Sequence, residues 1–311
     1  MKRSPAAAFW VVVISSLVLT SAHADTFYVS AANGNAILQF TAGGAGSLFA
    51  SGLAAPTGVA IDSAGNIYEA NNQNNTIQKF TPGGVGSIFA SSGLSQPQAL
   101  AFDSAGNLYV ANYTFGVEGT GNIVKFTPGG VGTVFASNLF DPLGLAVDSA
   151  GNVFVSVGGG GPNFRILKFT PAGVGSIFAS TGLNRPTGLA FDKTGNLFVA
   201  NEFSNTIVKF TPGGVGSVFA NTGLNGPFGL VFDSAGNLYA ANYGGEQGGG
   251  HTIEKFTPGG VASVFATTGT FSPYMIAILP EPSTWTMGIA LCIASCTALL
   301  SGAVRLLRRK S

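Results

Sequence analysis

The side chains that could do chemistry in this sequence gather in short segments that differ from one another, within a chain that is otherwise repetitive. Four of them are asparagines that each end an apolar run, and the others lie in the segments that follow such runs. Amides, carboxylates and aromatic rings in this combination are suited to binding sugar hydroxyls or a peptide. The candidate ligand-binding residues are Asn71, Asn112, Tyr113, Asn201, Glu202, Asn242, Tyr243 and His251.

A structural role is the alternative for the asparagines. An Asn side chain commonly bonds to the backbone of the turn that follows it. For the individual asparagines we favour such a turn cap over ligand binding, which leaves the aromatic and charged residues as the more selective part of the set.

The sequence offers little for catalysis. Once His23 is removed with the export signal described below, His251 is the only histidine, so neither a multi-histidine metal site nor a His/Glu lyase pair can be assembled. A lactonase-type site would hold one divalent cation with oxygen ligands, for which Asn112, Asn201 and Glu202 are of the right type. Carboxylates are sparse, so we assign no catalytic residue, no metal ligand and no cofactor.

Glu69 is out of place in its run, because the corresponding runs have Val or Ala there. Alternation along a strand puts its side chain on the same face as Ile67 and Asn71. A carboxylate buried between strands needs a partner. We predict a structural pair between Glu69 and Lys79, which lies on the next strand.

These residues belong to a unit that occurs six times. Its clearest marker is a run ending in Phe-Thr, and the copies are spaced by 40, 46, 43, 41 and 46 residues. Each unit contains four short β-type runs bounded by Gly, Pro, Asn and Asp, which is typical of a propeller blade. In the second unit the predicted strands, named a to d in chain order, are 58–61, 67–70, 76–80 and 87–90.

The first unit lacks a strand a, and the chain supplies an extra one at about 273–278. The predicted fold class is therefore all-β, a six-bladed propeller whose last strand completes the N-terminal blade and closes the ring. In a propeller the b–c and d–a connections share one face. The b–c connections vary between 6 and 11 residues whereas the other turns are uniform, so we expect that face to be the working surface.

The recurring pattern Pro-x-Gly-[Val/Leu]-Ala-[Ile/Phe/Val]-Asp-x-x-Gly-Asn-[Ile/Leu/Val]-[Tyr/Phe]-Val-Ala-Asn resembles the NHL repeat over residues 25–279. NHL copies often have Asp where this chain has Asn at the end of strand b. The resemblance implies a six-bladed propeller, a fold that gluconolactonase-like lactonases, virginiamycin B lyase and peptide-amidating lyases also have. It implies much less about activity.

The two ends of the chain carry patterns typical of export and sorting signals. Residues 1–24 have the basic, apolar and small-residue parts of a secretory signal peptide, with cleavage expected before Asp25. Pro280, Glu281 and Pro282 precede an apolar segment at about 286–304, which is long enough to span a membrane, and an Arg-rich end follows it. This order resembles a PEP-CTERM sorting signal, which implies recognition by an exosortase in the membrane. An uncleaved N-terminal anchor and a plain C-terminal anchor are the alternatives.

The distribution of charge along the chain argues against nucleic acid as a partner. The terminal segments hold six basic residues and one acidic residue, which leaves eight basic and twelve acidic residues and a net charge of about −4 for the middle. No basic patch indicates nucleic acid. We therefore expect an exported module, tethered by its C-terminal helix before processing, that binds polysaccharide or protein at the cell surface or in the matrix. A lactonase-like or lyase-like enzyme and an interaction platform for other exported proteins are the alternatives.

Overall fold

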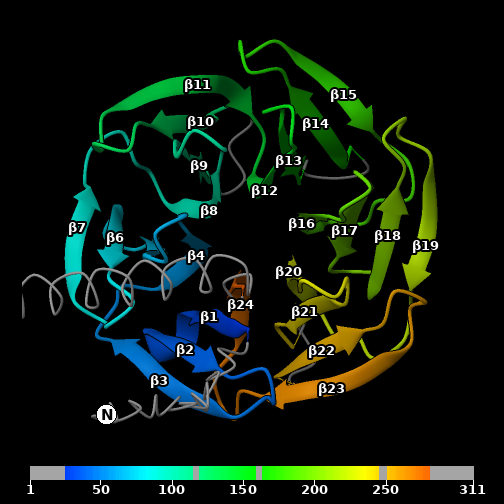
Figure 1. Ribbon diagram of the computed structural model, residues 1–311. Helices are drawn as coiled ribbons and strands as arrows, with labels where there is room; N and C mark the ends of the chain where they lie inside the picture. Colours follow the sequence, from blue (N-terminus) through cyan, green and yellow to red (C-terminus); the bar gives the residue numbers. More distant parts are fainter. Residues whose placement is uncertain (1–24, 115–118, 159–162, 245–250, 281–311) are drawn as a thin grey trace, which may run out of the picture.

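The computed structural model describes residues 25–114, 119–158, 163–244 and 251–280, which form six four-stranded antiparallel sheets arranged as a ring (Figure 1). In every sheet the strands follow the order a, b, c, d from the axis of the ring outward. The predicted six-bladed propeller is confirmed, and the predicted strand limits in the second unit agree with the structure to within two residues.

Strands a and b form the inner half of each blade. The a strands are β4 (Pro56–Ile61), β8 (Pro97–Phe102), β12 (Pro142–Val147), β16 (Pro186–Phe191), β20 (Pro227–Phe232) and β24 (Pro273–Leu279). The b strands are β1 (Thr26–Ala31), β5 (Ile67–Asn71), β9 (Leu108–Asn112), β13 (Val153–Val157), β17 (Leu197–Asn201) and β21 (Leu238–Asn242).

Strands c and d form the outer half. The c strands are β2 (Ala36–Phe40), β6 (Thr76–Phe80), β10 (Gly121–Phe126), β14 (Arg165–Phe169), β18 (Thr206–Phe210) and β22 (Thr252–Phe256). The d strands are β3 (Gly46–Ser51), β7 (Gly86–Ala90), β11 (Gly132–Leu139), β15 (Gly175–Ala179), β19 (Gly216–Ala220) and β23 (Ala262–Thr267). Blade 1 consists of β24 and β1–β3, and blades 2 to 6 follow in chain order.

The ring is closed by the pairing of the C-terminal strand β24 with the N-terminal strand β1. The strands are antiparallel, with Thr26 opposite Leu279 and Tyr28 opposite Ala277, and a short 3-10 helix, η1 (Ala32–Gly34), follows β1. The described residues between 25 and 280 therefore contain all four strands of each of the six sheets.

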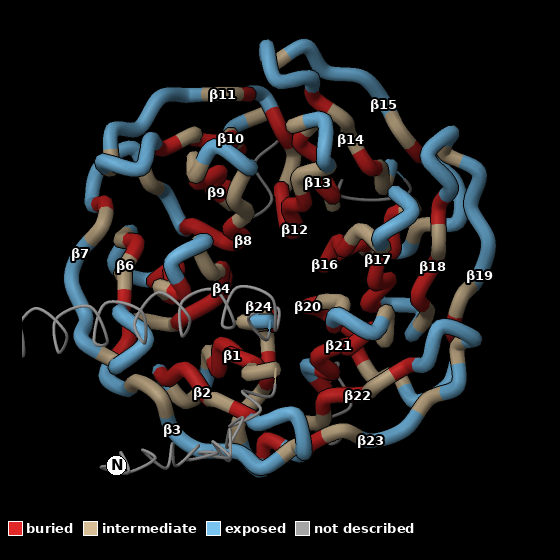
Figure 2. Tube along the Cα trace, in the orientation of Figure 1, coloured by how far each residue is buried: buried red, intermediate tan, exposed pale blue. Residues whose placement is uncertain are grey.

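The blades are held together by a buried aromatic and aliphatic core between neighbouring sheets. Tyr68 of blade 2 makes edge contacts at centroid distances of 5.0 Å with Phe89 of its own blade and with Phe102 of blade 3, and blades 4 and 5 repeat the arrangement. Figure 2 shows the result, because buried residues fill the inner strands whereas the d strands are largely exposed.

The a strands approach one another so closely that a side chain is excluded at one position. A Cβ atom on Gly188 of β16 would lie 2.1 Å from the carbonyl oxygen of Phe228 in β20. Gly144 and Thr187 stand in the same relation, at 2.0 Å. In blades 4 and 5 the Gly of the Pro-x-Gly pattern is thus required by packing between blades rather than by a turn, whereas Ala99 and Met275 occupy this position in blades 3 and 1.

The a–b turns are stabilised by their aspartates. In blade 3 the carboxylate of Asp103 accepts hydrogen bonds from the backbone amides of Ala105 (3.0 Å) and Asn107 (2.8 Å) and from the Asn107 side chain (2.8 Å). Gly106 has the left-handed φ of +80° that this turn needs. The carboxylates of Asp62, Asp148 and Asp192 accept the corresponding hydrogen bonds in their own turns.

The predicted pair between Glu69 and Lys79 is wrong. The Lys79 ammonium lies 3.7 Å from the carboxylate of Asp62 and 5.1 Å from the centre of the Tyr68 ring. Lys79 and Glu69 lie on adjacent strands, but Lys79 is opposite Tyr68 and Glu69 is opposite Gln78. Successive side chains on a strand point to opposite faces, so Lys79 shares a face with Tyr68 and not with Glu69.

Candidate ligand-binding face

The four asparagines at the ends of b strands are buried and connect two loops. The Oδ1 atom of Asn201 accepts a hydrogen bond from the Asn184 amide (3.1 Å), and its Nδ2 donates to the Gly182 carbonyl (2.9 Å), both in the d–a connection. The same Nδ2 lies 3.2 Å from the Thr206 hydroxyl at the start of strand c. Asn112 and Asn242 make the corresponding bonds.

Asn71 makes a subset of these contacts, with the Ala54 amide at 2.9 Å and Gln78 at 3.5 Å. The interpretation of these asparagines as caps of their own b–c turn is therefore incomplete, because most of their bonds go to the preceding d–a connection. Their amide groups are used to hold the loops, which leaves ligand binding on this face to neighbouring residues.

Three positions in each blade surround these asparagines, and their side chains differ between blades. One position precedes the Pro of strand a, one follows that Pro, and one follows the end of strand b. In chain order the residues before the Pro are Ala55, Gln96, Asp141, Arg185, Gly226 and Ser272. The residues after the Pro are Thr57, Gln98, Leu143, Thr187, Phe228 and Tyr274. The residues after strand b are Ala32, Asn72, Tyr113, Gly158, Glu202 and Tyr243.

The backbone at these positions is uniform. The amide after strand b donates to the carbonyl before the Pro in five blades, as from Glu202 to Arg185 (3.1 Å) and from Tyr243 to Gly226 (3.0 Å). The residue before the Pro has a left-handed φ between 41° and 56° in those five blades, although only Gly226 is a glycine. We call the face that carries these positions the loop face, and the face with the a–b and c–d turns the turn face.

Blade 5 contributes an ion pair to the loop face. Nη1 of Arg185 lies 2.6 Å from both carboxylate oxygens of Glu202, and the guanidinium lies 5.0 Å from the centre of the Phe203 ring. The side chain of Glu202 is only 9% exposed, whereas the Phe203 ring is 55% exposed. Burial raises the pKa of Tyr113, and the charge of Asp141 adds to the effect while a hydrogen bond with Arg185 opposes it.

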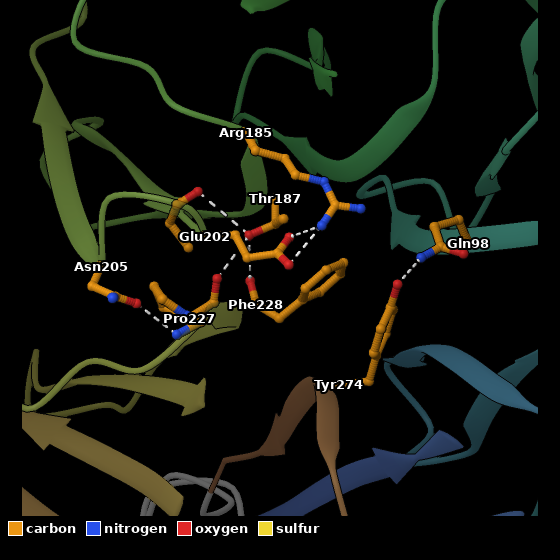
Figure 3. A network of polar contacts seen from close by, with 10 residues as sticks. Gln98, Arg185, Thr187, Glu202, Asn205, Pro227, Phe228 and Tyr274 are labelled. Carbon is orange, nitrogen blue, oxygen red and sulfur yellow. Dashed lines mark hydrogen bonds and ion pairs between the residues drawn. The ribbon is translucent and has the colours of Figure 1, made fainter. Parts of the chain in front are cut away.

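Blades 1 and 6 contribute three aromatic rings beside this pair. The centroids of Phe228 and Tyr274 are 3.9 Å apart, and those of Tyr243 and Tyr274 are 5.6 Å apart. The Tyr274 hydroxyl accepts a hydrogen bond from the Gln98 side chain in blade 3. Figure 3 shows Tyr274 extending towards Gln98 and the Arg185–Glu202 pair beside Phe228.

Tyr274 interacts with the aromatic rings, with Gln98 and with the Arg185–Glu202 pair. Burial raises its pKa above the usual range for tyrosine, with the negative charge of Glu202 as a further cause, while Arg185 and Gln98 act in the opposite direction. The side chain of blade 1 therefore interacts with residues of blades 3, 5 and 6. The loop face holds a cluster of aromatic, amide and charged groups that no single repeat contains.

The structure thus brings together only part of the predicted set. Tyr113, Glu202 and Tyr243 lie in the cluster, with Tyr243 36% exposed. The nitrogens of the His251 ring lie 3.3 Å from the Gly269 carbonyl and 3.4 Å from the Ser272 hydroxyl, in the β23–β24 connection.

The candidate residues chosen from the sequence do not include Arg185, Asp141, Phe203, Gln98, Phe228 or Tyr274, although the alignment of the repeats places Gln98, Phe228 and Tyr274 around the channel mouth. Comparing the six copies at the position before each strand-a Pro would also have found Arg185 and Asp141, because the side chains there vary where the backbone is constant. Phe203, one residue further along the b–c connection, had no such signal.

A metal centre gains no support from the described residues, which contain no group of three or more His, Cys, Asp and Glu side chains that could hold a metal ion. Of the lactonase-type ligands considered from the sequence, Asn112 and Asn201 have their amide oxygens bonded to backbone amides. Glu202 is paired with Arg185. These oxygens would have to exchange their present partners in order to bind a cation.

The predicted export and sorting segments lie almost wholly outside the described residues. This holds for the signal peptide, for Glu281 and Pro282, and for the predicted span at 286–304, whereas Pro280 is the last residue described. No helix among the described residues is long and apolar enough to cross a membrane.

Comparison with known proteins shows the fold. No protein-family model matches the sequence, and no curated protein matches it either. A chain from a crystal structure of a nidogen/laminin complex is similar with a TM-score of 0.71 and 17% identity, covering 82% of this chain and 98% of that one. A gluconolactonase from Xanthomonas campestris is similar with a TM-score of 0.61 and 20% identity, covering 70% and 79%.

Virginiamycin B lyase from Staphylococcus aureus is also similar, with a TM-score of 0.54 and 16% identity over 71% of this chain and 73% of that one. These proteins include two enzymes and a chain from a complex between two proteins, so the shared fold accommodates both catalysis and binding. The NHL resemblance is confirmed at the level of the fold: this chain is a six-bladed β-propeller with four-stranded blades.

Proposed function

We propose that this protein is an exported binding module that recognises a neutral polysaccharide through the loop face. The observation that carries the proposal is the aromatic cluster beside the Arg185–Glu202 pair. The side chains of Tyr243 and Phe203 are 36% and 55% exposed, and aromatic rings of this kind are suited to stacking on the apolar face of a sugar ring. Arg185, whose side chain is 30% exposed, supplies hydrogen-bond donors for hydroxyl groups.

The preference for a neutral ligand follows from charge. Glu202 compensates Arg185 at 2.6 Å, and Asp141 adds a further negative charge near Tyr113. A polysaccharide rich in uronate or sulfate would bring more negative charge to a cluster that has no excess of positive charge. Neutral hexose units are therefore the favoured ligands.

Titration calorimetry of residues 25–280 tests this proposal. The probes are neutral glucan and mannan oligosaccharides, with alginate oligosaccharides as the acidic comparison. We expect binding of a neutral probe and a roughly tenfold or greater loss of affinity in Tyr243→Ala and Phe203→Ala. Val131→Ala, which removes an exposed side chain from a c–d turn on the turn face, is the matched control and should bind normally.

The other interpretations predict different results. If only alginate binds, or if Val131→Ala loses as much affinity as the cluster variants, then neutral sugar binding cannot be assigned to this cluster. Turnover of a lactone that requires a divalent cation and disappears in folded Asn201→Ala would favour a lactonase-like enzyme. Capture of another exported protein without sugar binding would favour the interaction platform.

Export and C-terminal processing are the second part of the proposal, and the order of segments at both ends supports them. Trp10 and Trp285 are the only tryptophans, and both lie outside the propeller. A protein released after removal of both ends should show no tryptophan fluorescence. Persistent emission from the released form would mean that the segment with Trp285 is retained.

A further inference from the structure

A groove opens in blade 5, next to the cluster on the loop face. It has a volume of about 420 Å³ and lies between the β15–β16 connection and strands β18 and β19, which form the outer half of the blade (Figure 1). We call it the blade-5 groove. The residues that line it include Thr181, Leu183, Asn184, Ser204, Val208 and Val218.

One buried side chain holds the two sides of the blade-5 groove together. On the β15–β16 side, Asn201 accepts a hydrogen bond from the Asn184 amide (3.1 Å) and donates to the Gly182 carbonyl (2.9 Å). On the β18 side, its Nδ2 lies 3.2 Å from the Thr206 hydroxyl. All four residues line the groove. The groove is therefore preformed, so a ligand that enters it does not have to order a loop.

The blade-5 groove is open because one of its residues is short. Val208 of β18 is 4% exposed and lines the groove. In blade 6 the corresponding residue is Glu254, whose Oε2 atom would lie 3.4 Å from a Cβ atom on Gly223 in the d–a connection. In blade 2 it is Gln78, whose Oε1 lies 3.5 Å from Nδ2 of Asn71. Long polar side chains thus extend into this space in blades 2 and 6, whereas valine leaves it free in blade 5.

The lining of the blade-5 groove is polar but uncharged. Thr181, Ser204 and Ser217 are exposed and bring hydroxyl groups, which both donate and accept hydrogen bonds. Leu183 and Val218 add apolar surface, and none of the residues along the groove is charged. Sugar units combine hydroxyl groups with apolar C–H surface, so this lining suits a neutral sugar better than an ionised ligand.

The blade-5 groove and the cluster are formed by the same two connections. On the d–a connection, Arg185 of the cluster directly follows Asn184 of the groove. On the b–c connection, Phe203 beside Arg185 directly precedes Ser204 of the groove. The Phe203 amide donates a hydrogen bond to the Asn184 carbonyl (3.4 Å), so the two connections are in contact here. A chain that lies on Phe203 is therefore one residue away from the groove.

We propose that the blade-5 groove is a second subsite, occupied by the continuation of a neutral polysaccharide chain whose other units stack on Tyr243 and Phe203. This inference rests on the proposed function and deepens it, because the ligand is then an extended chain and not a single terminal sugar. Two contacts made by one chain add affinity, since the second contact is intramolecular. Affinity should therefore depend on the length of the chain.

Titration calorimetry with oligosaccharides of increasing length tests the proposal on residues 25–280. The probes are a disaccharide, a tetrasaccharide and a hexasaccharide of the neutral glucan and mannan series. For the wild type we expect affinity to rise roughly tenfold or more from the disaccharide to the hexasaccharide. Val208→Gln, which places the blade-2 residue in the groove, should abolish this rise without changing the affinity for the disaccharide.

Two further variants separate the groove from effects on folding. Val124→Gln makes the same change at the corresponding position of blade 3, where Val124 is 2% exposed, and should leave the length dependence intact. Asn184→Ala keeps the backbone bond to Asn201, as Ala54 does to Asn71 in blade 2. It should weaken binding of the hexasaccharide about threefold or more, and that of the disaccharide should not change. Melting curves establish that all variants are folded.

The outcomes distinguish this inference from the function on which it rests. If no neutral oligosaccharide of any length binds, both are wrong. If neutral oligosaccharides bind through Tyr243 with an affinity that does not depend on length, only the second subsite is wrong. The same conclusion follows if folded Val208→Gln keeps the length dependence, or if Val124→Gln abolishes it equally.

Discussion

The loop face and the turn face of this propeller are built from the same six repeats, yet they differ in what varies. On the turn face both the backbone and the side chains repeat, as in the Asp103 turn and its copies. On the loop face the backbone repeats, but the side chains before and after each strand-a Pro do not.

This contrast separates stability from recognition. The repeated groups hold turns and blades, and they explain why the six units fold alike. The variable groups are supported by the buried asparagines and therefore need not contribute to folding themselves. Substitutions that keep the repeated frame should alter binding with little effect on stability, whereas substitutions in the frame should do the opposite.

The largest effect is expected where the a strands approach each other. Gly188→Ala places a Cβ atom 2.1 Å from the Phe228 carbonyl, which forces two blades apart. We expect a loss of about 3 kcal/mol in the free energy of unfolding, measured by urea denaturation. Gly213→Ala in the c–d turn of the same blade is the control, because its nearest neighbour, the Thr211 hydroxyl, is 3.9 Å away. Equal losses in both variants would refute the packing explanation.

Glu69 does not fit this division between repeated structural groups and variable loop-face groups. It occurs in one blade only, and yet it is buried within a strand. Its side chain is 0% exposed, and neither carboxylate oxygen has a hydrogen-bond partner among the described residues. Burial raises the pKa of Glu69 well above its ordinary value of 4.5. Glu69→Val, the residue of most other blades, should stabilise the fold by about 1–3 kcal/mol at pH 8.

The pH dependence provides the check. The unfolded chain loses the Glu69 proton near pH 4.5, whereas the folded chain keeps it to higher pH. The contribution of this group is therefore fully present below pH 4.5 and is lost as the pH rises towards the folded pKa. Urea denaturation from pH 4 to pH 8 should show a decline for the wild type that is smaller in Glu69→Val and in Glu69→Gln. Parallel curves for all three proteins would contradict this assignment.

A smaller effect is expected from a single aspartate on the turn face. Burial raises the pKa of Asp103, but hydrogen bonds from Asn107 and the charge of Lys125 outweigh it and hold the pKa below its ordinary value. Asp103→Asn should cost about 1 kcal/mol at pH 7. The stabilisation by the ionised group is present above about pH 3.8 and is lost as the pH falls through the folded pKa, so the difference should shrink in acid.

Tyr243→Ser on the loop face provides the comparison for this last prediction. Its stability should remain within about 0.5 kcal/mol of the wild type at pH 7, as for other surface changes. A larger loss in Tyr243→Ser than in Asp103→Asn would mean that the loop face is part of the structural frame.

Local signals were sufficient to predict the strands and turns. The Asp-x-x-Gly-Asn turn, the Phe-Thr ends of the c strands and the missing first strand are all visible within one repeat or in the register of the copies. The closure by β24 could be inferred because one unit lacked a strand and the last unit had an extra one. The loop-face cluster could be predicted only as a face, since its members come from blades 1, 3, 5 and 6.

The repeated frame follows from the sequence alone: six blades, their turns and the closure of the ring. These features depend on periodicity and on short-range preferences of Gly, Pro, Asp and Asn. The contacts between side chains of different strands and blades depend on how the chain packs in three dimensions. Lys79 pairs with Asp62 and not Glu69 because of the side-chain direction on its strand. Gln98 bonds to Tyr274 across 176 residues of chain because closing the ring brings distant blades together, and no local pattern records such a contact.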